Sequence, residues 1–308
     1  APANSSLANP CQLIGCVSPV GIPANATAAH SAARSGLKQR VLTVMVLVPL
    51  LLACMFLLPG PGWQLLTCLP IALAADEWAR LAGYQRTTRI AFIGIIFTSC
   101  LAFVAAFSSA GFSVGANGLS KWLFVVALMF WAIAAPLWLY RGWHATQPLF
   151  LGMVGWIVLV PAWLAAAVLQ RSPWLLLAML LVVWVADTAA YFAGRSFGRR
   201  KLAPQISPGK TWEGVIGAFA AVLIYGFVAS FVLQPSANVF DRMVTIIFVA
   251  AMTVLSIVGD LFESWIKRGA GAKDSGGLLP GHGGLLDRID SLTAALPFAA
   301  LYYLPALG

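Results

Sequence analysis

The sequence predicts an all-α, polytopic integral membrane protein with about nine transmembrane helices. Hydrophobic residues make up 60% of its 308 residues and charged residues only 9%, and the mean hydropathy is +0.87. Soluble domains are less apolar and carry about 25% charged residues. The apolar runs are continuous and do not alternate, which favours membrane-spanning helices over the strands of a β-barrel.

Two regions are expected along the chain. Residues 1–40 form a flexible tail, because positions 1–33 are rich in Ala, Pro, Ser and Asn and hold no Lys, Arg, Asp or Glu. Residues 41–308 form the transmembrane domain. Its apolar helices are expected at 41–58, 64–83, 89–108, 120–139, 149–169, 174–194, 212–233, 242–266 and 291–307.

The distribution of basic residues predicts the orientation in the membrane. With the N-terminus in the cytoplasm, 16 of the 19 Lys and Arg residues fall in cytoplasmic segments, and only Lys121, Arg171 and Arg242 fall outside. This bias follows the positive-inside rule and places the C-terminus outside. It also puts the two charge-rich loops, 195–211 and 267–290, on the cytoplasmic side. The net charge of +9 is then largely a signal of orientation and does not indicate nucleic-acid binding.

The first polar cluster begins at Asp187, which follows a long apolar run and stands at the cytoplasmic end of its helix. Asp187 could simply pair with a nearby Arg, but acids in membrane segments usually serve a function, which favours a metal ligand or a substrate contact. Arg195 and Lys210 follow in a basic loop, which is also a common topology signal. Positions 207–211, which include Ser207, are expected to open a helix whose N-terminus suits a phosphate.

The second cluster is a polar stripe on the helix around Asp260. Its members recur at spacings of three and four residues and therefore share one helical face. They are Ser256, Asp260, Glu263, Ser264 and Lys267. The remaining positions are apolar, so the stripe should face the bundle interior or a wet cavity.

The third cluster is the Gly-rich stretch 269–290. Bare glycines let a ligand approach the backbone and can form an anion-binding nest. His282 could be a structural histidine, but its glycine neighbours and the nearby Lys273 and Arg288 favour contact with a phosphate or nucleotide. Asp287 and Asp290 are three residues apart and share one helical face.

Together, the clusters place four carboxylates at the cytoplasmic ends of three helices: Asp187, Asp260, Asp287 and Asp290. Hard oxygen ligands of this kind suit Mg²⁺. The surrounding basic residues are Lys210, Lys267, Arg268, Lys273 and Arg288. Acids that hold a metal, next to cations that neutralise phosphate charge, are typical of phosphoryl or nucleotidyl transfer.

These residues resemble a family signature. The matching positions are Ser264-x-x-Lys267-Arg268, Lys273-Asp274, Pro280-x-His282-Gly283-Gly284 and Asp287-Arg288-x-Asp290. They resemble the signature of the phosphatidate cytidylyltransferases, also called CDP-diglyceride synthetases. Positions 187–213 resemble a second, less specific region of that family, and the other helices are similar in number and hydropathy only.

The resemblance implies an activity in phospholipid biosynthesis: transfer of CMP from CTP to phosphatidic acid, which gives CDP-diacylglycerol and pyrophosphate. It also implies that the enzyme uses Mg²⁺, together with a second cation that is monovalent, such as K⁺, and that it forms a homodimer. The protein would be a multi-pass protein of the inner (plasma) membrane, with its site open to the cytoplasm. The partners are then CTP and membrane phosphatidic acid, with no nucleic acid. Helices within 41–170 would mainly form a scaffold, and 174–308 would carry the active site.

With this activity, roles can be assigned to individual residues. Asp260 and Asp287 are the first candidates for metal ligands, and Asp187 and Asp290 the second. Lys267, Arg268 and Arg288 are expected to hold the phosphates of CTP or pyrophosphate, and Arg195 and Lys210 the lipid phosphate or the nucleotide. The other expected substrate contacts are Ser207, Ser264, Lys273, Asp274, His282, Gly283 and Gly284.

Three alternatives remain. The protein could be another Mg²⁺-dependent membrane phosphotransferase. A CDP-alcohol phosphotransferase is disfavoured, because the motif of that class begins with Asp-Gly, whereas Asp187 is followed by Thr188. An ion transporter could use Asp187 and Asp260, but the charges gather at one face and do not cross the bilayer. A scaffold for membrane assembly would have no use for the glycine-rich loop.

Overall fold

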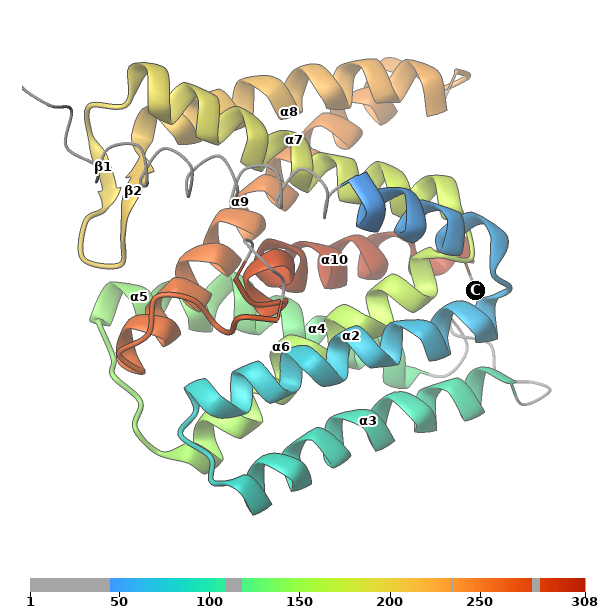
Figure 1. Cartoon of the computed structure of the whole chain (residues 1–308). Coiled ribbons are helices and arrows are strands. Elements are labelled where there is room, and N and C mark those ends of the chain that lie inside the picture. Colours follow the sequence, from blue (N-terminus) through green and yellow to red (C-terminus); the bar gives the residue numbers. More distant parts are fainter. Residues whose placement is uncertain (1–44, 109–117, 234, 279–282, 308) are drawn as a thin grey trace, which may run out of the picture.

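The structure, a computed structural model, describes residues 45–108, 118–233, 235–278 and 283–307, so the predicted tail lies outside the described residues. Long helices packed side by side make up most of it (Figure 1). The described helices, long and short, are Met45–Leu57, α2 (Gly60–Leu81), α3 (Arg86–Ser108), α4 (Gly118–Met129), the π-helix η1 (Phe130–Ala134), α5 (Ala135–Arg141), α6 (Pro148–Leu169), α7 (Pro173–Phe197), α8 (Trp212–Leu233), α9 (Val239–Gly269) and α10 (Leu286–Leu307).

The helix boundaries agree with those expected from the apolar runs, and local sequence explains several of them. Proline stands in the first turn of α2, α6 and α7, where its missing N–H costs no hydrogen bond. The 31-residue helix α9 begins with a capping box, in which Asn238 accepts a hydrogen bond from the backbone N–H of Asp241. At 1.5 Å per residue, α9 is about 46 Å long.

Six of the described helices are long and apolar enough to cross a membrane. They are Arg86–Ala106, Gly118–Arg141, Pro148–Leu169, Pro173–Phe197, Trp212–Val232 and Val239–Gly269. The protein is therefore a mostly helical membrane protein. The expected count of nine spans is not confirmed, since Met45–Leu57 is shorter and neither α2 nor α10 is among the six.

α10 occupies the middle of the bundle, where it packs against α9, α6, α4 and α7 (Figure 1). An aromatic cluster joins α9 to η1 and α5. Phe262 of α9 is fully buried and meets Phe130, Trp131 and Trp138 edge to face, with ring centroids 5.3, 5.6 and 5.4 Å away. Such contacts fix the rotation of a helix, and here they turn the polar stripe of α9 away from the aromatic side.

A short β-hairpin joins α7 to α8 and is an element that the sequence analysis did not predict. Strands β1 (Lys201–Ala203) and β2 (Ser207–Thr211) pair antiparallel, with Lys201 opposite Thr211. Residues 207–211 lead directly into a helix, as predicted, but they form a strand and not a turn. Helix α8 begins only at Trp212, after Thr211, whose hydroxyl accepts the N–H of Gly214 at 3.1 Å. Lys210 therefore lies on a strand.

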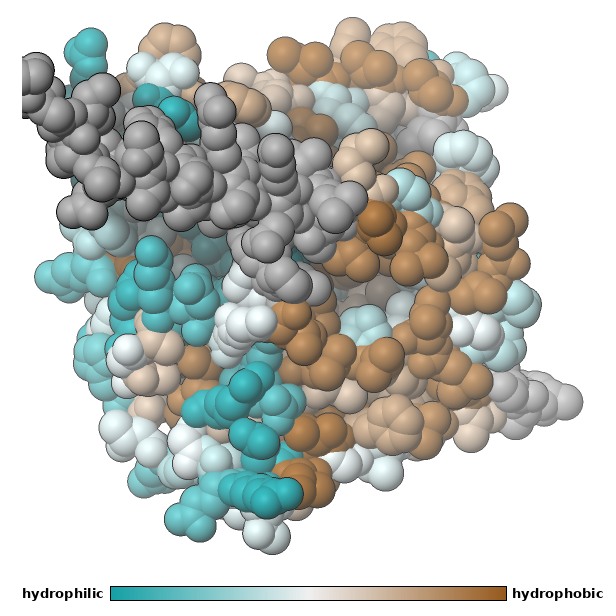
Figure 2. Space-filling view, viewed as in Figure 1, coloured by the Kyte–Doolittle hydropathy of each residue, from teal (hydrophilic) through white to brown (hydrophobic). Residues whose placement is uncertain are grey.

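Polar and apolar surfaces are separated along the bundle. Hydrophilic residues gather on the left of Figure 2, the end where Figure 1 places the hairpin and the C-terminal part of α9. Nε of Arg268 donates to the carbonyl of Ile206 at 3.3 Å and so joins the end of α9 to the hairpin. The described parts of the loops 195–211 and 267–290 thus lie at one end of the molecule, and their cytoplasmic location stays a prediction.

Candidate active site

A cavity of about 530 Å³ opens between α7, the hairpin, α8, α9 and α10. All four predicted carboxylates line it, although they come from three helices. The polar lining residues are Asp187, Tyr191, Arg195, Ser207, Lys210, Thr211, Asp260, Asp287, Arg288, Asp290 and Ser291. Eight of the predicted site residues thus meet in one place, four of them acids and three of them bases.

Asp260 forms an ion pair with a lysine of the hairpin. Nζ of Lys210 lies 2.6 Å from Oδ2 of Asp260, and the hydroxyl of Ser264 lies 3.4 Å from Oδ1. The charge of Asp187 on α7 interacts with both Asp260 and Lys210. One lysine therefore neutralises part of the negative charge where α7 and α9 approach each other.

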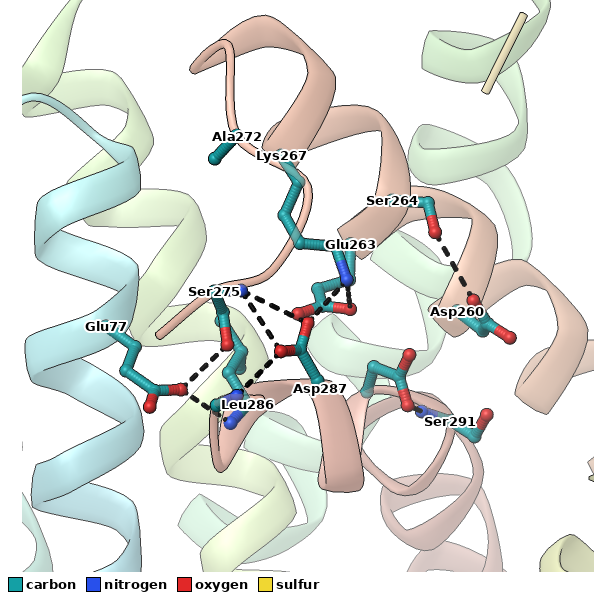
Figure 3. A network of polar contacts seen from close by, with 12 residues as sticks. Glu77, Asp260, Glu263, Ser264, Lys267, Ala272, Ser275, Leu286, Asp287 and Ser291 are labelled. Atoms are coloured by element: carbon teal, nitrogen blue, oxygen red, sulfur yellow. Dashed lines mark hydrogen bonds and ion pairs between the residues drawn. The ribbon is translucent and has the colours of Figure 1, made fainter. Parts of the chain in front are cut away.

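Asp287 is held by a dense set of donors at the start of α10 (Figure 3). Its carboxylate accepts from Nζ of Lys267 at 2.6 Å, from the backbone N–H of Gly284 at 2.8 Å, and from that of Ser275 at 3.1 and 3.2 Å. Burial raises the pKa of Asp287, but the hydrogen bonds from Lys267, Gly284 and Ser275 outweigh it, so the pKa lies below its usual value. This carboxylate stays charged and fixed in direction.

Lys267 does not line the cavity. Its ammonium is buried between Asp287 and Glu263, with Oε2 of Glu263 at 2.8 Å. Sequence reasoning expected this lysine to hold a phosphate. Its contacts instead suit a counterion that orients Asp287, because a phosphate would have to displace two carboxylates. Glu263 was placed on the polar stripe from the sequence but not in the site, and its Oε1 is buried without a hydrogen-bond partner in the described chain.

The approach of α9 to α10 near Asp290 depends on a glycine. A Cβ at Gly259 would lie 2.7 Å from the carbonyl oxygen of Asp290 and 3.0 Å from Cβ of Ala294. Oδ1 of Asp290 accepts the N–H of Ser291 at 2.7 Å. The second carboxylate of α10 thereby lies beside α9 and lines the same cavity as Asp260.

The remaining predicted residues lie around the cavity. Arg268 is exposed and bridges the hairpin turn to the carbonyl of Ala272. Lys273 and Asp274 are exposed on the loop after α9, and Gly283 has a left-handed φ of 82° beside Asp287. His282 lies outside the described residues.

The donor set suits a hard cation, since it consists of carboxylate oxygens with an unpaired buried oxygen nearby. The positions of these oxygens fit a metal site less well. Among the described residues, no three His, Cys, Asp or Glu side chains are gathered as a metal site. Ammonium groups of Lys210 and Lys267 stand next to Asp260 and Asp287. Predicted metal binding at these four acids therefore stays a prediction.

Sequence reasoning missed Glu77 on α2. This residue is 1% exposed and binds the loop that leads into α10. A carboxylate in an apolar helix was itself a signal, but its partners lie about two hundred residues further along the chain.

The helices and the cavity define a multi-pass membrane protein with a cluster of acids and bases at one end of its bundle. The chain belongs to the cytidylyltransferase family, whose model matches residues 38–305. It is 41% identical to the phosphatidate cytidylyltransferase of Pseudomonas aeruginosa over 281 residues, which are 88% of this chain and 99% of that protein. Its relative of the same name in Haemophilus influenzae is 36% identical over 288 residues, covering 87% and 98%.

A more distant protein matches only in part. The phosphatidate cytidylyltransferase of Thermotoga maritima is 44% identical over 129 residues, 41% of this chain and 48% of its own length. The family resemblance expected from the signature between Ser264 and Asp290 is confirmed, and the protein is a nucleotidyltransferase.

Proposed function

We propose that this protein transfers CMP from CTP to phosphatidic acid and so makes CDP-diacylglycerol and pyrophosphate. The observation that carries this proposal is the match to phosphatidate cytidylyltransferases over nearly the full chain. It is supported by the cavity, where four acids and three bases from distant segments converge.

The reaction needs no covalent intermediate on the protein. An oxygen of the lipid's phosphate attacks the α-phosphorus of CTP and forms the new P–O bond. The bond from the α-phosphorus to the bridging oxygen breaks, and pyrophosphate leaves with its electron pair. Catalysis then consists of positioning and of neutralising charge, which fits a cavity rich in fixed ionic groups.

The lining suggests a division of roles. Lys210, Arg195 and Arg288 line the cavity and would hold phosphates of the nucleotide and lipid. Asp260 and Asp287, with Asp187 and Asp290 beside them, would hold Mg²⁺. When bound, Mg²⁺ would supply positive charge that offsets the charge of the phosphates.

Nine spans, a cytoplasmic N-terminus and an external C-terminus would place the cavity at the cytoplasmic face of the inner membrane, where CTP is available. The bias of basic residues supports this orientation. The homodimer and a K⁺ ion beside Mg²⁺ rest on the family resemblance.

The decisive experiment uses purified full-length protein in detergent with CTP, phosphatidic acid and Mg²⁺. We expect pyrophosphate release and incorporation of labelled cytidine into lipid, both dependent on both substrates. Pyrophosphate release without phosphatidic acid, or no turnover at all, would contradict the proposal. Ion uptake by sealed proteoliposomes, in the absence of nucleotide turnover, would instead support the transporter alternative.

A further inference from the structure

Glu77 is a buried carboxylate that lies outside the cavity and binds its framework. Oε2 accepts hydrogen bonds from the hydroxyl of Ser275 at 2.8 Å and from the backbone N–H of Leu286 at 2.8 Å. Oε1 accepts the N–H of Leu285 at 3.0 Å. Figure 3 shows the side chain reaching from α2 toward these groups, between the loop and the first turn of α10.

Because Glu77 is buried, its carboxylate needs hydrogen-bond donors from the protein. Only 1% of the residue is exposed, and a buried carboxylate is costly unless donors compensate it. All three donors are neutral. Two of them belong to the start of α10, whose N–H groups lack helical partners and carry partial positive charge. Glu77 therefore caps α10 from another helix.

The same segments are held by Asp287. The N–H of Ser275 binds Asp287 while the hydroxyl of Ser275 binds Glu77. Gly284, just before Leu285, also donates its N–H to Asp287. The two carboxylates thus clamp the loop at Ser275 and again at its junction with α10.

The clamp is tightly packed. A Cβ at Gly276 would lie 2.5 Å from Oε1 of Glu77, and one at Gly284 would lie 2.5 Å from Oε2. Real Cβ atoms do not approach so closely, so the backbone at both positions has been brought directly against the carboxylate. This geometry leaves the start of α10 little freedom to shift relative to α2.

We propose that Glu77 is a positioning residue for the active site, which fixes the first turn of α10 so that Asp287 and Asp290 face the cavity. The kinetic part of this inference rests on the proposed cytidylyl transfer. Glu77 itself is absent from the cavity lining, so it acts through α10 and does not touch substrate.

The test compares Glu77→Gln with Asp76→Asn. Glutamine keeps the shape but turns an N–H₂ donor toward groups that are themselves donors. Asp76 is the neighbouring acid on α2, and its side chain pairs with Arg80 and Arg89, away from the loop. We expect Glu77→Gln to lower kcat by about tenfold to a hundredfold, because displacing a reacting group by about 1 Å has effects of this size.

Two further readouts separate positioning from simple stability. The KM for CTP should change by less than about threefold, since a loss of positioning mainly affects the transition state. Hydrogen exchange of the peptides that cover 275–287 should speed up in Glu77→Gln, with the full-length protein held well below its unfolding temperature. Asp76→Asn should leave kcat and this exchange near the wild-type values.

An unchanged kcat in Glu77→Gln, or unchanged exchange at 275–287, would overturn the proposal. If that variant does not fold, Ser275→Ala decides in its place. It removes one neutral donor and should lower kcat by about fivefold, as the loss of one hydrogen bond allows, with faster exchange in the same peptides. Wild-type kcat and exchange in Ser275→Ala would then overturn it. A wild-type protein without cytidylyl transfer would contradict the proposed function, while exchange would still test the clamp.

Discussion

Lys210 of β2 and Asp260 of α9 form an ion pair of 2.6 Å within the cavity. The pair joins two clusters that are fifty positions apart in the sequence, and it makes the hairpin part of the site. Both side chains are partly buried, at 24% and 31% exposure, so water screens their interaction less than at an open surface.

This pair gives a first prediction. Lys210→Met should lower the rate of cytidylyl transfer by more than about tenfold, because a cation aimed at transferring phosphates is lost. Lys201→Met is the control, since Lys201 lies on the other strand of the hairpin, is exposed and does not line the cavity. Initial rates at saturating CTP measure both. Equal rates in the two variants would exclude Lys210 from the site.

Metal removal gives a second prediction. EDTA should abolish turnover and Mg²⁺ should restore it, because carboxylates of this cavity are proposed to hold the ion. Asp260→Asn should raise the Mg²⁺ concentration for half-maximal rate by about tenfold or more, since one charged ligand is lost. Asp241→Asn, at the distant start of α9, should leave that concentration unchanged. A Mg²⁺ titration that is identical in Asp260→Asn would contradict the assignment.

The buried lysine gives a third prediction. Lys267→Met leaves two buried carboxylates, Glu263 and Asp287, without their shared cation. Breaking such a buried pair costs about 3–5 kcal/mol. Arg268→Met, one residue further on, removes an exposed cation and should cost less than about 1 kcal/mol. Thermal unfolding in detergent compares the two. A melting temperature of Lys267→Met no lower than that of Arg268→Met would refute the counterion role.

Helix packing gives a fourth prediction. Gly259→Ala would place a methyl group 2.7 Å from the carbonyl oxygen of Asp290, so α9 and α10 must separate. Overpacking of this kind costs about 1–3 kcal/mol, and activity should fall with it because both helices carry site acids. Gly94→Ala on α3 is the control, since nothing lies within 4 Å of its added Cβ. Thermal unfolding and initial rates should distinguish the two variants, and matching results would count against the close approach.

Much of the molecule could be predicted from the sequence because lipid imposes simple demands. Apolar length fixed the helix positions to within a few residues, and costly charges in apolar surroundings pointed to Asp187, Asp260, Asp287 and Asp290. All four line one cavity, and their roles stay a prediction.

The errors have physical causes as well. The hairpin strands are only three and five residues long and have an irregular register, so they leave almost no periodic pattern. Lys267 is a residue type that often binds phosphate, and only the three-dimensional contacts reveal that two carboxylates already surround it. Glu77 depends on partners from the opposite end of the chain, which no local pattern can indicate.

The length of α9 has a consequence for how the two substrates meet. From Val239 to Asp260 the helix rises about 32 Å, which is close to the thickness of the hydrocarbon layer, about 30 Å. If α9 starts at one face and crosses along the membrane normal, Asp260 would lie at the opposite interface, with the last turns of α9 beyond it. A lipid diffusing sideways in its leaflet and a nucleotide diffusing in water can then collide at one shared boundary, and neither has to leave its own solvent.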